Sequence, residues 1–230
     1  MTAPAPTTAA RAVAPVRLAG RVGTAIAIGV ALGTAAWASD QLSYPWSVLL
    51  PANAVGAWVG VAFVSGALAG GLFGGLVRGL ISLLVGVGVY ELLTGTLGYG
   101  VASGGAVHAS LVWGAVACAI GPVFGAAGAT WRGASGRPRA VAVGLLAAAL
   151  VAEGVVFGGP RLVSGGDLVA IDPGALLLAA EIALGLALPW VLLRPAERRD
   201  GYVALAVLAV AAAVVLGPAF GLIRSVADRF

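Results

Sequence analysis

The stretch LISLLVGVGVYELLTGTL, Leu80 to Leu97, decides the fold class of this chain. Its 18 residues include one charged side chain, Glu91, and as an α-helix they are long enough to cross about 30 Å of hydrocarbon. Similar runs recur along the 230 residues, of which 60% are hydrophobic and 10% charged, with a mean hydropathy of +1.05. Backbone groups in lipid must be hydrogen-bonded within the protein, and the alternating pattern of a β-barrel is absent. The sequence therefore predicts an all-α, polytopic bundle of transmembrane helices.

We expect seven spans, with boundaries that the hydropathy places only approximately. They are Val22–Ala38, Ala54–Phe73, Leu80–Leu97, Ala106–Thr130, Ala140–Phe157, Gly174–Leu193 and Tyr202–Ile223. The second and third spans are nearly continuous and together too long for one crossing, so the chain should turn near Gly74–Gly79. A disordered cytoplasmic tail, residues 1–21, precedes the single transmembrane domain, residues 22–223, and a short outer tail, residues 224–230, follows it.

The arginines indicate the orientation of the spans. All 13 basic residues are arginine, and a cytoplasmic N-terminus places ten of them in inner segments and three in outer ones. The positive-inside rule then predicts a multi-pass protein of the cell (plasma) membrane, with its N-terminus inside and its C-terminus outside. A cleaved signal peptide ending near Ala36–Ala38 is the alternative, and it would leave six spans in the same orientation.

The composition excludes several classes of chemistry. Without lysine the chain can form no Schiff base with retinal or pyridoxal and no Walker-type phosphate site. One histidine, His108, and one cysteine, Cys118, exclude a His/Cys zinc site, a paired-His haem and an internal disulfide. The net charge of +4 comes from short loops and does not indicate nucleic-acid binding. We therefore expect no cofactor, no metal and no nucleic acid, with membrane lipids and a small molecule as partners.

Three carboxylates lie inside the predicted spans: Glu91, Glu153 and Glu181. Each is 13 or 14 residues from an arginine at the inner end of its span, which puts all three about 20 Å above the inner boundary. Acids inside a membrane usually face the bundle interior and mark a functional site. We therefore expect the three to converge on one cavity as catalytic groups. The alternative is structural, because a buried, protonated glutamate can simply hydrogen-bond a neighbouring helix.

Aromatic residues occur at a similar height. Trp58, Tyr90 and Trp113 are deep enough to line the same cavity, and Asp40 lies near its outer edge, so these four are the predicted substrate-binding residues. An aromatic belt at the membrane interface is the alternative. The belt is the better interpretation for Trp37, Tyr44 and Trp46 at the outer interface and for Trp131 and Trp190 at the inner one.

Glycine spacing predicts close helix packing. SGALAGGLFGGLVRG, Ser65 to Gly79, holds the ladders Gly66/Gly70/Gly74 and Gly71/Gly75/Gly79. Small residues four apart let another helix approach closely, either within the chain, which we favour, or in a homo-oligomer. GPVFG (Gly121–Gly125) recurs as GPAFG (Gly217–Gly221), a pair that suggests the kinked helices of a transporter.

Several features of the sequence occur together: Trp58 with Gly66, Tyr90-Glu91, Trp113 with GPVFG and Gly128, Trp131-Arg132, and Ala152-Glu153. In this combination the chain resembles an uncharacterised family of small actinobacterial integral-membrane proteins. The resemblance covers Trp58 to Glu153. It implies a polytopic membrane fold and no particular activity.

The side chains available favour a cofactor-free membrane enzyme. Acid-catalysed cyclisation of an isoprenoid (a terpene) would use a protonated glutamate, aromatic faces that stabilise carbocations, and an apolar cavity that excludes water. The alternative is a proton-coupled transporter or a substrate-binding membrane subunit for a lipophilic or cationic small molecule. A purely structural role is the third hypothesis.

Overall fold

The computed structural model of the protein describes residues 8–43, 52, 54–97, 104–163 and 173–227, and side chains within a part of these. Helices account for nearly all of the described chain: α1 (Thr8–Asp40), α3 (Val55–Ala67), α4 (Leu72–Leu97), α5 (Gly104–Gly133), α6 (Arg137–Val163), α7 (Pro173–Leu192) and α8 (Pro195–Ala227). Over the described residues, five helices are long and apolar enough to cross a membrane, namely α1, α4, α5, α6 and α7. The predicted all-helical, membrane-spanning class is confirmed. Seven spans were expected, and α3 and α8 are not among these five helices; α3, with 13 residues, is too short to cross about 30 Å of hydrocarbon. The orientation stays a prediction.

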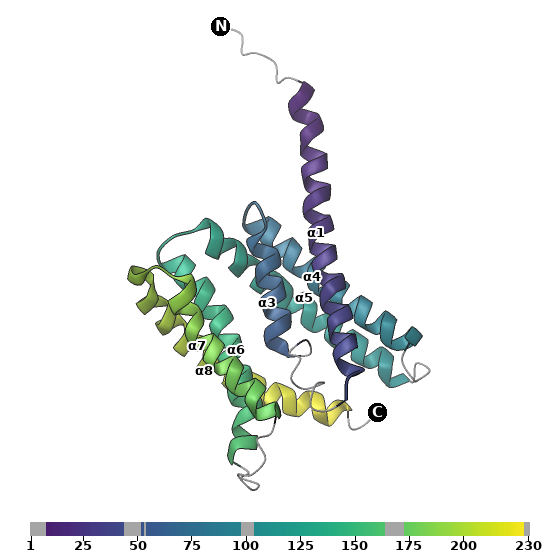
Figure 1. Ribbon diagram of the computed structural model, residues 1–230, viewed down its shortest axis with the longest axis vertical. Helices are drawn as coiled ribbons and strands as arrows, with labels where there is room; N and C mark the ends of the chain where they lie inside the picture. Colours follow the sequence, from purple (N-terminus) through teal and green to yellow (C-terminus); the bar gives the residue numbers. More distant parts are fainter. Residues whose placement is uncertain (1–7, 44–51, 53, 98–103, 164–172, 228–230) are drawn as a thin grey trace.

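Successive helices run in alternating directions, so that the α3–α4, α5–α6 and α7–α8 connections share one end of the bundle (Figure 1). We name this the arginine end, after Arg132, Arg137, Arg139, Arg194, Arg198 and Arg199. At the opposite end α1 and α4 end and α3 begins (Figure 1). We name it the acid end, after Asp40 and Glu91, which lie together there with Tyr90 and Val55.

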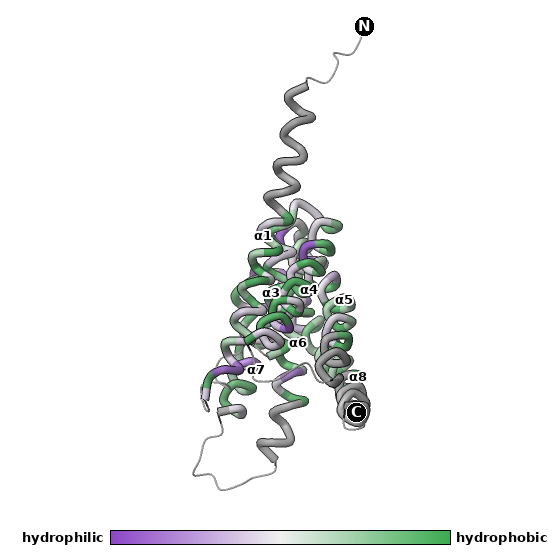
Figure 2. Tube along the Cα trace, turned by 90° about the vertical axis from the view of Figure 1, so that its right-hand side faces the viewer, coloured by the Kyte–Doolittle hydropathy of each residue, from purple (hydrophilic) through white to green (hydrophobic). Residues whose placement is uncertain are grey.

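The helices form two groups in contact. Helices α1, α3, α4 and α5 pack together, and α6 packs against both α7 and α8, while α3 and α5 join the groups through α6. Figure 2 shows hydrophobic residues along the middle of both groups. This arrangement places the first turn of α3 beside both groups at the acid end, where it can contact α6 and α7.

Glycines let α3 and α4 approach α5 backbone to backbone. The facing residues are Gly66 on α3, Gly75 and Gly79 on α4, and Gly121, Gly125 and Gly128 on α5. A methyl group on Gly75 would lie 2.6 Å from the carbonyl oxygen of Gly125, and one on Gly121 would lie 3.0 Å from that of Gly79. Such distances leave no room for a side chain. These glycines therefore serve packing within the chain, and homo-oligomerisation stays a prediction.

The turn between α3 and α4 differs from the predicted one. It falls on residues 68–71, so Gly74–Gly79 belong to the first turns of α4 and Gly70 lies outside both helices. The physical reason is Arg78, which is buried within the hairpin instead of marking its surface. Its Nε donates to the carbonyl oxygen of Ser65 at 2.9 Å, and the Ser65 hydroxyl donates to the Arg78 carbonyl at 3.3 Å. Gly66, Gly70 and Gly74 consequently do not share one helical face.

The segment before the first span also differs from the prediction. Residues 1–21 were expected to be disordered, but α1 is helical from Thr8 and extends beyond the bundle (Figure 1). Alanine and arginine are good helix formers and are common in this segment, although Pro15 within the helix removes one backbone donor. Residues 1–7 lie outside the described part of the chain.

Candidate functional site

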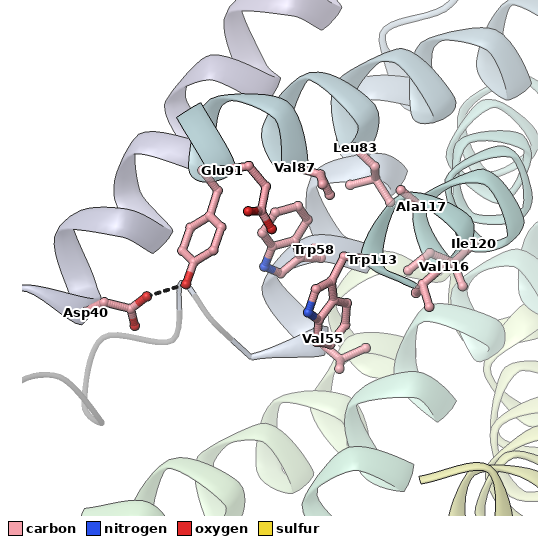
Figure 3. A pocket seen from close by; sticks show the side chains of 11 residues that line it. Asp40, Val55, Trp58, Leu83, Val87, Glu91, Trp113, Val116, Ala117 and Ile120 are labelled. Atoms are coloured by element: carbon pink, nitrogen blue, oxygen red, sulfur yellow. Dashed lines mark hydrogen bonds between the residues drawn. The ribbon is translucent and has the colours of Figure 1, made fainter. Parts of the chain in front are cut away.

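A pocket of about 290 Å³ opens at the acid end between α1, α3, α4 and α5 (Figure 3). Its lining combines Asp40, Trp58, Tyr90, Glu91 and Trp113 with aliphatic side chains of α3, α4 and α5. In Figure 3 the Glu91 side chain is directed to the space that the indoles of Trp58 and Trp113 border. The four predicted binding residues and one predicted acid thus lie together. Their functional roles stay predictions.

Hydrogen bonds hold two of the aromatic side chains of the pocket, Tyr90 and Trp58. The Tyr90 hydroxyl donates to Oδ2 of Asp40 at 2.6 Å, which joins the last turns of α1 and α4. A bond to an ionised acceptor is stronger than a neutral one. Trp58 Nε1 donates to the Ala52 carbonyl oxygen at 3.0 Å. With their polar atoms engaged, these rings can present their faces to a ligand.

Glycines on α1 allow the Tyr90–Asp40 contact. A methyl group on Gly33 would lie 3.0 Å from the backbone nitrogen of Tyr90 and 3.0 Å from Val89 Cβ, and one on Gly29 would lie 2.9 Å from Val85 Cβ. The absence of Cβ atoms lets α1 lie directly on α4. Asp40, at the C-terminal end of α1, is then within reach of the Tyr90 hydroxyl.

Glu153 caps the N-terminus of α3 from another helix. The first amide groups of a helix have no partner within that helix, and the N-cap residue, Ala54, has no side-chain acceptor to offer them. Glu153 of α6 supplies both acceptors: Oε1 receives the Val55 N–H at 2.7 Å, and Oε2 receives the Gly56 N–H at 2.5 Å. The helix dipole also favours a carboxylate at this end.

Glu181 of α7 lies beside this cap. A methyl group on Gly56 would lie 3.2 Å from Oε1 of Glu181 and 3.4 Å from Oε2 of Glu153, so both carboxyl groups abut the same glycine. Glu153 is 7% exposed and Glu181 5%. Among the described residues, Oε2 of Glu181 has no hydrogen-bond partner although it is buried. The site therefore contains a polar atom whose burial is not compensated.

The three acids do not share one cavity as expected. Glu91 lines the pocket, whereas Glu153 and Glu181 are absent from its lining and meet at Gly56. The reason is the start of α3: its first turn lies between the two positions, with the Val55 side chain in the pocket wall and the Val55 N–H bonded to Glu153. The catalytic role of all three stays a prediction.

The amides of Val55 and Gly56, and Gly56 itself, are site components that the sequence did not reveal. Backbone donors leave no signal in a sequence, and Glu153 is 98 positions from Val55. The only hint was an alanine at the helix start, where a capping side chain is usual.

The belt residues fall partly inside the described chain. At the arginine end, Trp131 Nε1 donates to the Leu192 carbonyl at 3.4 Å, and the Arg198 guanidinium lies 3.7 Å from the centre of the Trp190 ring. Tyr44 and Trp46, and the side chains of His108 and of the GPAFG segment, lie outside the described residues.

Five helices of membrane-spanning length in the described part of the chain define a multi-spanning helical membrane protein. Over residues 12–224 the chain matches a model described as "Family of unknown function (DUF6518)", and it belongs to that family. No curated protein and no solved structure matches the chain. The predicted relation to an uncharacterised family is confirmed, over a longer segment than Trp58 to Glu153.

Proposed function

We propose that the protein is a substrate-binding membrane protein whose acid-end pocket takes a small organic cation with an apolar part, and that its arginine end faces the cytoplasm. The observation that carries the proposal is the meeting of Glu91 with Trp58 and Trp113 around one apolar pocket. Indole faces attract cations, and the attraction strengthens where water is displaced. Glu91 is an acidic group beside these indole faces, in a lining whose other acid, Asp40, accepts the Tyr90 hydroxyl.

The lining residues suit different parts of such a ligand. The cationic group would lie between the two indole faces and Glu91, since Asp40 already accepts the Tyr90 hydroxyl. The apolar part would contact Val55, Leu83 and Val87. Trp113 is 48% exposed and lies within the span of α5, so this wall of the pocket borders the surface of the helix bundle. Such a site suits a transporter or the substrate-binding subunit of a larger membrane assembly.

Isoprenoid cyclisation has less support from this geometry. A cyclase needs a proton donor in a cavity that excludes water, and Glu91 is the one predicted catalytic acid in the pocket lining. Binding of a preformed cation uses the same aromatic faces and requires no closure.

Benzyltrimethylammonium and its neutral isostere neopentylbenzene test the proposal. Binding is measured by tryptophan fluorescence of the full chain in nanodiscs, with empty nanodiscs as the partition control. We expect the cation to bind in preference to the isostere, and Glu91→Gln and Trp113→Ala each to weaken binding about tenfold. Trp190→Ala, an exposed tryptophan at the arginine end, is the matched control and should leave binding unchanged. Equal binding of cation and isostere, or unchanged binding in Glu91→Gln, contradicts the proposal.

A further inference from the structure

The acid pair behind the pocket is not needed to hold the proposed cation. Glu153 and Glu181 come from different helices and meet at the first turn of α3 without contributing to the pocket lining. We propose that Glu153 and Glu181 together hold one proton, carried by Glu181, and form a proton-binding site whose occupancy is coupled to the pocket through the first turn of α3. The proton site stands on its own geometry, and the coupling rests on the proposed function.

The two carboxyl groups differ in their partners. Both oxygens of Glu153 accept N–H groups of α3, and the helix dipole adds to their effect. Glu181 offers a buried Oε2 that no described residue contacts by a hydrogen bond. An unpaired buried charge is costly, and two neighbouring carboxylates repel each other. A single proton on Glu181 relieves both costs and leaves Glu153 free to cap α3.

No basic side chain of the described residues faces the pair to replace the proton. Helix α3 has no ionisable side chain, and α7 has none besides Glu181. The other described ionisable side chains on α6 and on the helices that pack against it lie away from the pair, most of them at the arginine end. They are Cys118 and Arg132 on α5, Arg137 and Arg139 on α6, and Glu197, Arg198, Arg199, Asp200 and Tyr202 on α8. The described residues also contain no group of three metal-binding side chains. Because Glu153 faces N–H donors, a proton suits the pair better than a metal cation does.

Val55 links the pair to the pocket. Its N–H is bonded to Glu153 while its side chain forms part of the pocket wall. Trp58 follows within the same turn and is itself held through Ala52, just before the helix. A change of charge on the pair acts on the first turn of α3 and therefore on two lining residues. It also changes the negative potential that a bound cation experiences.

Infrared difference spectroscopy of the full chain in nanodiscs tests the proton site without any ligand. At neutral pH we expect a carbonyl-stretch band of a protonated carboxyl group that is lost in Glu181→Gln and kept in Glu91→Gln, the matched pocket acid. Glu153→Gln is the second variant if Glu181→Gln fails to accumulate, and it should also lose or shift the band. The proposal is overturned if wild type lacks the band, if only Glu91→Gln removes it, or if sodium chloride abolishes it, which would indicate a sodium site.

Binding of benzyltrimethylammonium at different pH values tests the coupling. The cation should bind about threefold to tenfold more weakly at neutral pH, where the pair holds its proton, than at alkaline pH, where the pair has released it. Glu181→Gln should remove most of this dependence while the cation still binds. Undiminished pH dependence in Glu181→Gln overturns the coupling. If the cation fails to bind any variant, the proposed function and the coupling fall together, while the infrared result still decides the proton site.

Discussion

The two ends of α3 are held by opposite charges from neighbouring helices. At its N-terminus, the Glu153 carboxylate accepts the Val55 and Gly56 N–H groups, and at its C-terminus, the Arg78 guanidinium donates to the Ser65 carbonyl. Each sign complements the helix dipole at that end. Each end of this 13-residue helix is thus stabilised by a side chain whose charge is opposite to that of the helix dipole there.

The ends differ in what surrounds the backbone. At the arginine end Gly66 contacts the Gly125 backbone, and a methyl group on Gly128 would lie 2.8 Å from the backbone nitrogen of Ala67. At the acid end, Gly56 contacts side-chain ends, namely Leu150 Cδ2 and the two carboxyl groups. Side-chain ends can move at small cost and packed backbones cannot. One helix is therefore rigid at one end and adjustable where it borders the pocket.

The largest effect is expected for Gly66→Ala. Its methyl group would overlap the Gly125 carbonyl, and neither backbone can withdraw, so the folded state should lose more than about 3 kcal/mol or fail to accumulate. Gly60→Ala on the same helix has open space at its Cβ and should be stable or gain up to about 1 kcal/mol. Thermal unfolding followed by size-exclusion fluorescence compares the two.

Gly56→Ala makes the same change at the adjustable end. Leu150 Cδ2 and the carboxyl groups can shift, so its cost should be below about 1 kcal/mol. Equal losses in Gly56→Ala and Gly66→Ala would remove the distinction between the ends.

Glu153→Ala is expected to have an intermediate effect. It leaves the Val55 and Gly56 N–H groups without an acceptor, which should cost about 2 kcal/mol. Glu153→Gln keeps one acceptor oxygen and should lose less. Hydrogen exchange should rise at the Val55 and Gly56 amides in the alanine variant and remain slow near Ser65. Uniform exchange along α3 would mean that the cap does not act locally.

The sequence predicted the membrane class and the pocket acid more readily than the ends of α3, although seven spans were expected and five helices of spanning length lie in the described residues. Hydropathy identified the membrane class, and depth counting along the spans grouped Trp58, Tyr90, Glu91 and Trp113, which now line one pocket. The α3–α4 turn was misplaced because the glycine-rich run has no polar break except Arg78, which is buried. The meeting of Glu153 with α3 could not be predicted, because it joins a distant side chain to backbone donors.

The smallest expected effect on stability is that of Glu197, which lies at the arginine end. Both of its carboxylate oxygens have hydrogen-bond partners. It accepts the Gly136 N–H at 2.7 Å and the Arg194 N–H at 3.3 Å, and so ties the α5–α6 loop, where Gly136 has φ +66°, to the start of α8. The Gly136 N–H bond, followed by the Arg194 N–H and the charges of Arg139 and Arg194, lowers the pKa of Glu197 below its ordinary value. The ionised form thus stabilises the fold above that ordinary pKa, and the contribution is lost as the pH falls through the lower folded-state pKa.

The Tm of wild type should therefore fall by a small amount in acid, and Glu197→Gln should abolish this decrease. Asp200, an exposed acid on the same helix, provides the matched control, because Asp200→Asn should leave the decrease in place. Glu181→Gln should leave this part of the acid dependence intact as well, because Glu181 lies at the other end of the bundle. The acid-induced decrease then reports the arginine end alone. If Glu181→Gln abolished it instead, the two ends of the molecule would be energetically coupled, and the division of α3 into a rigid and an adjustable end would not hold.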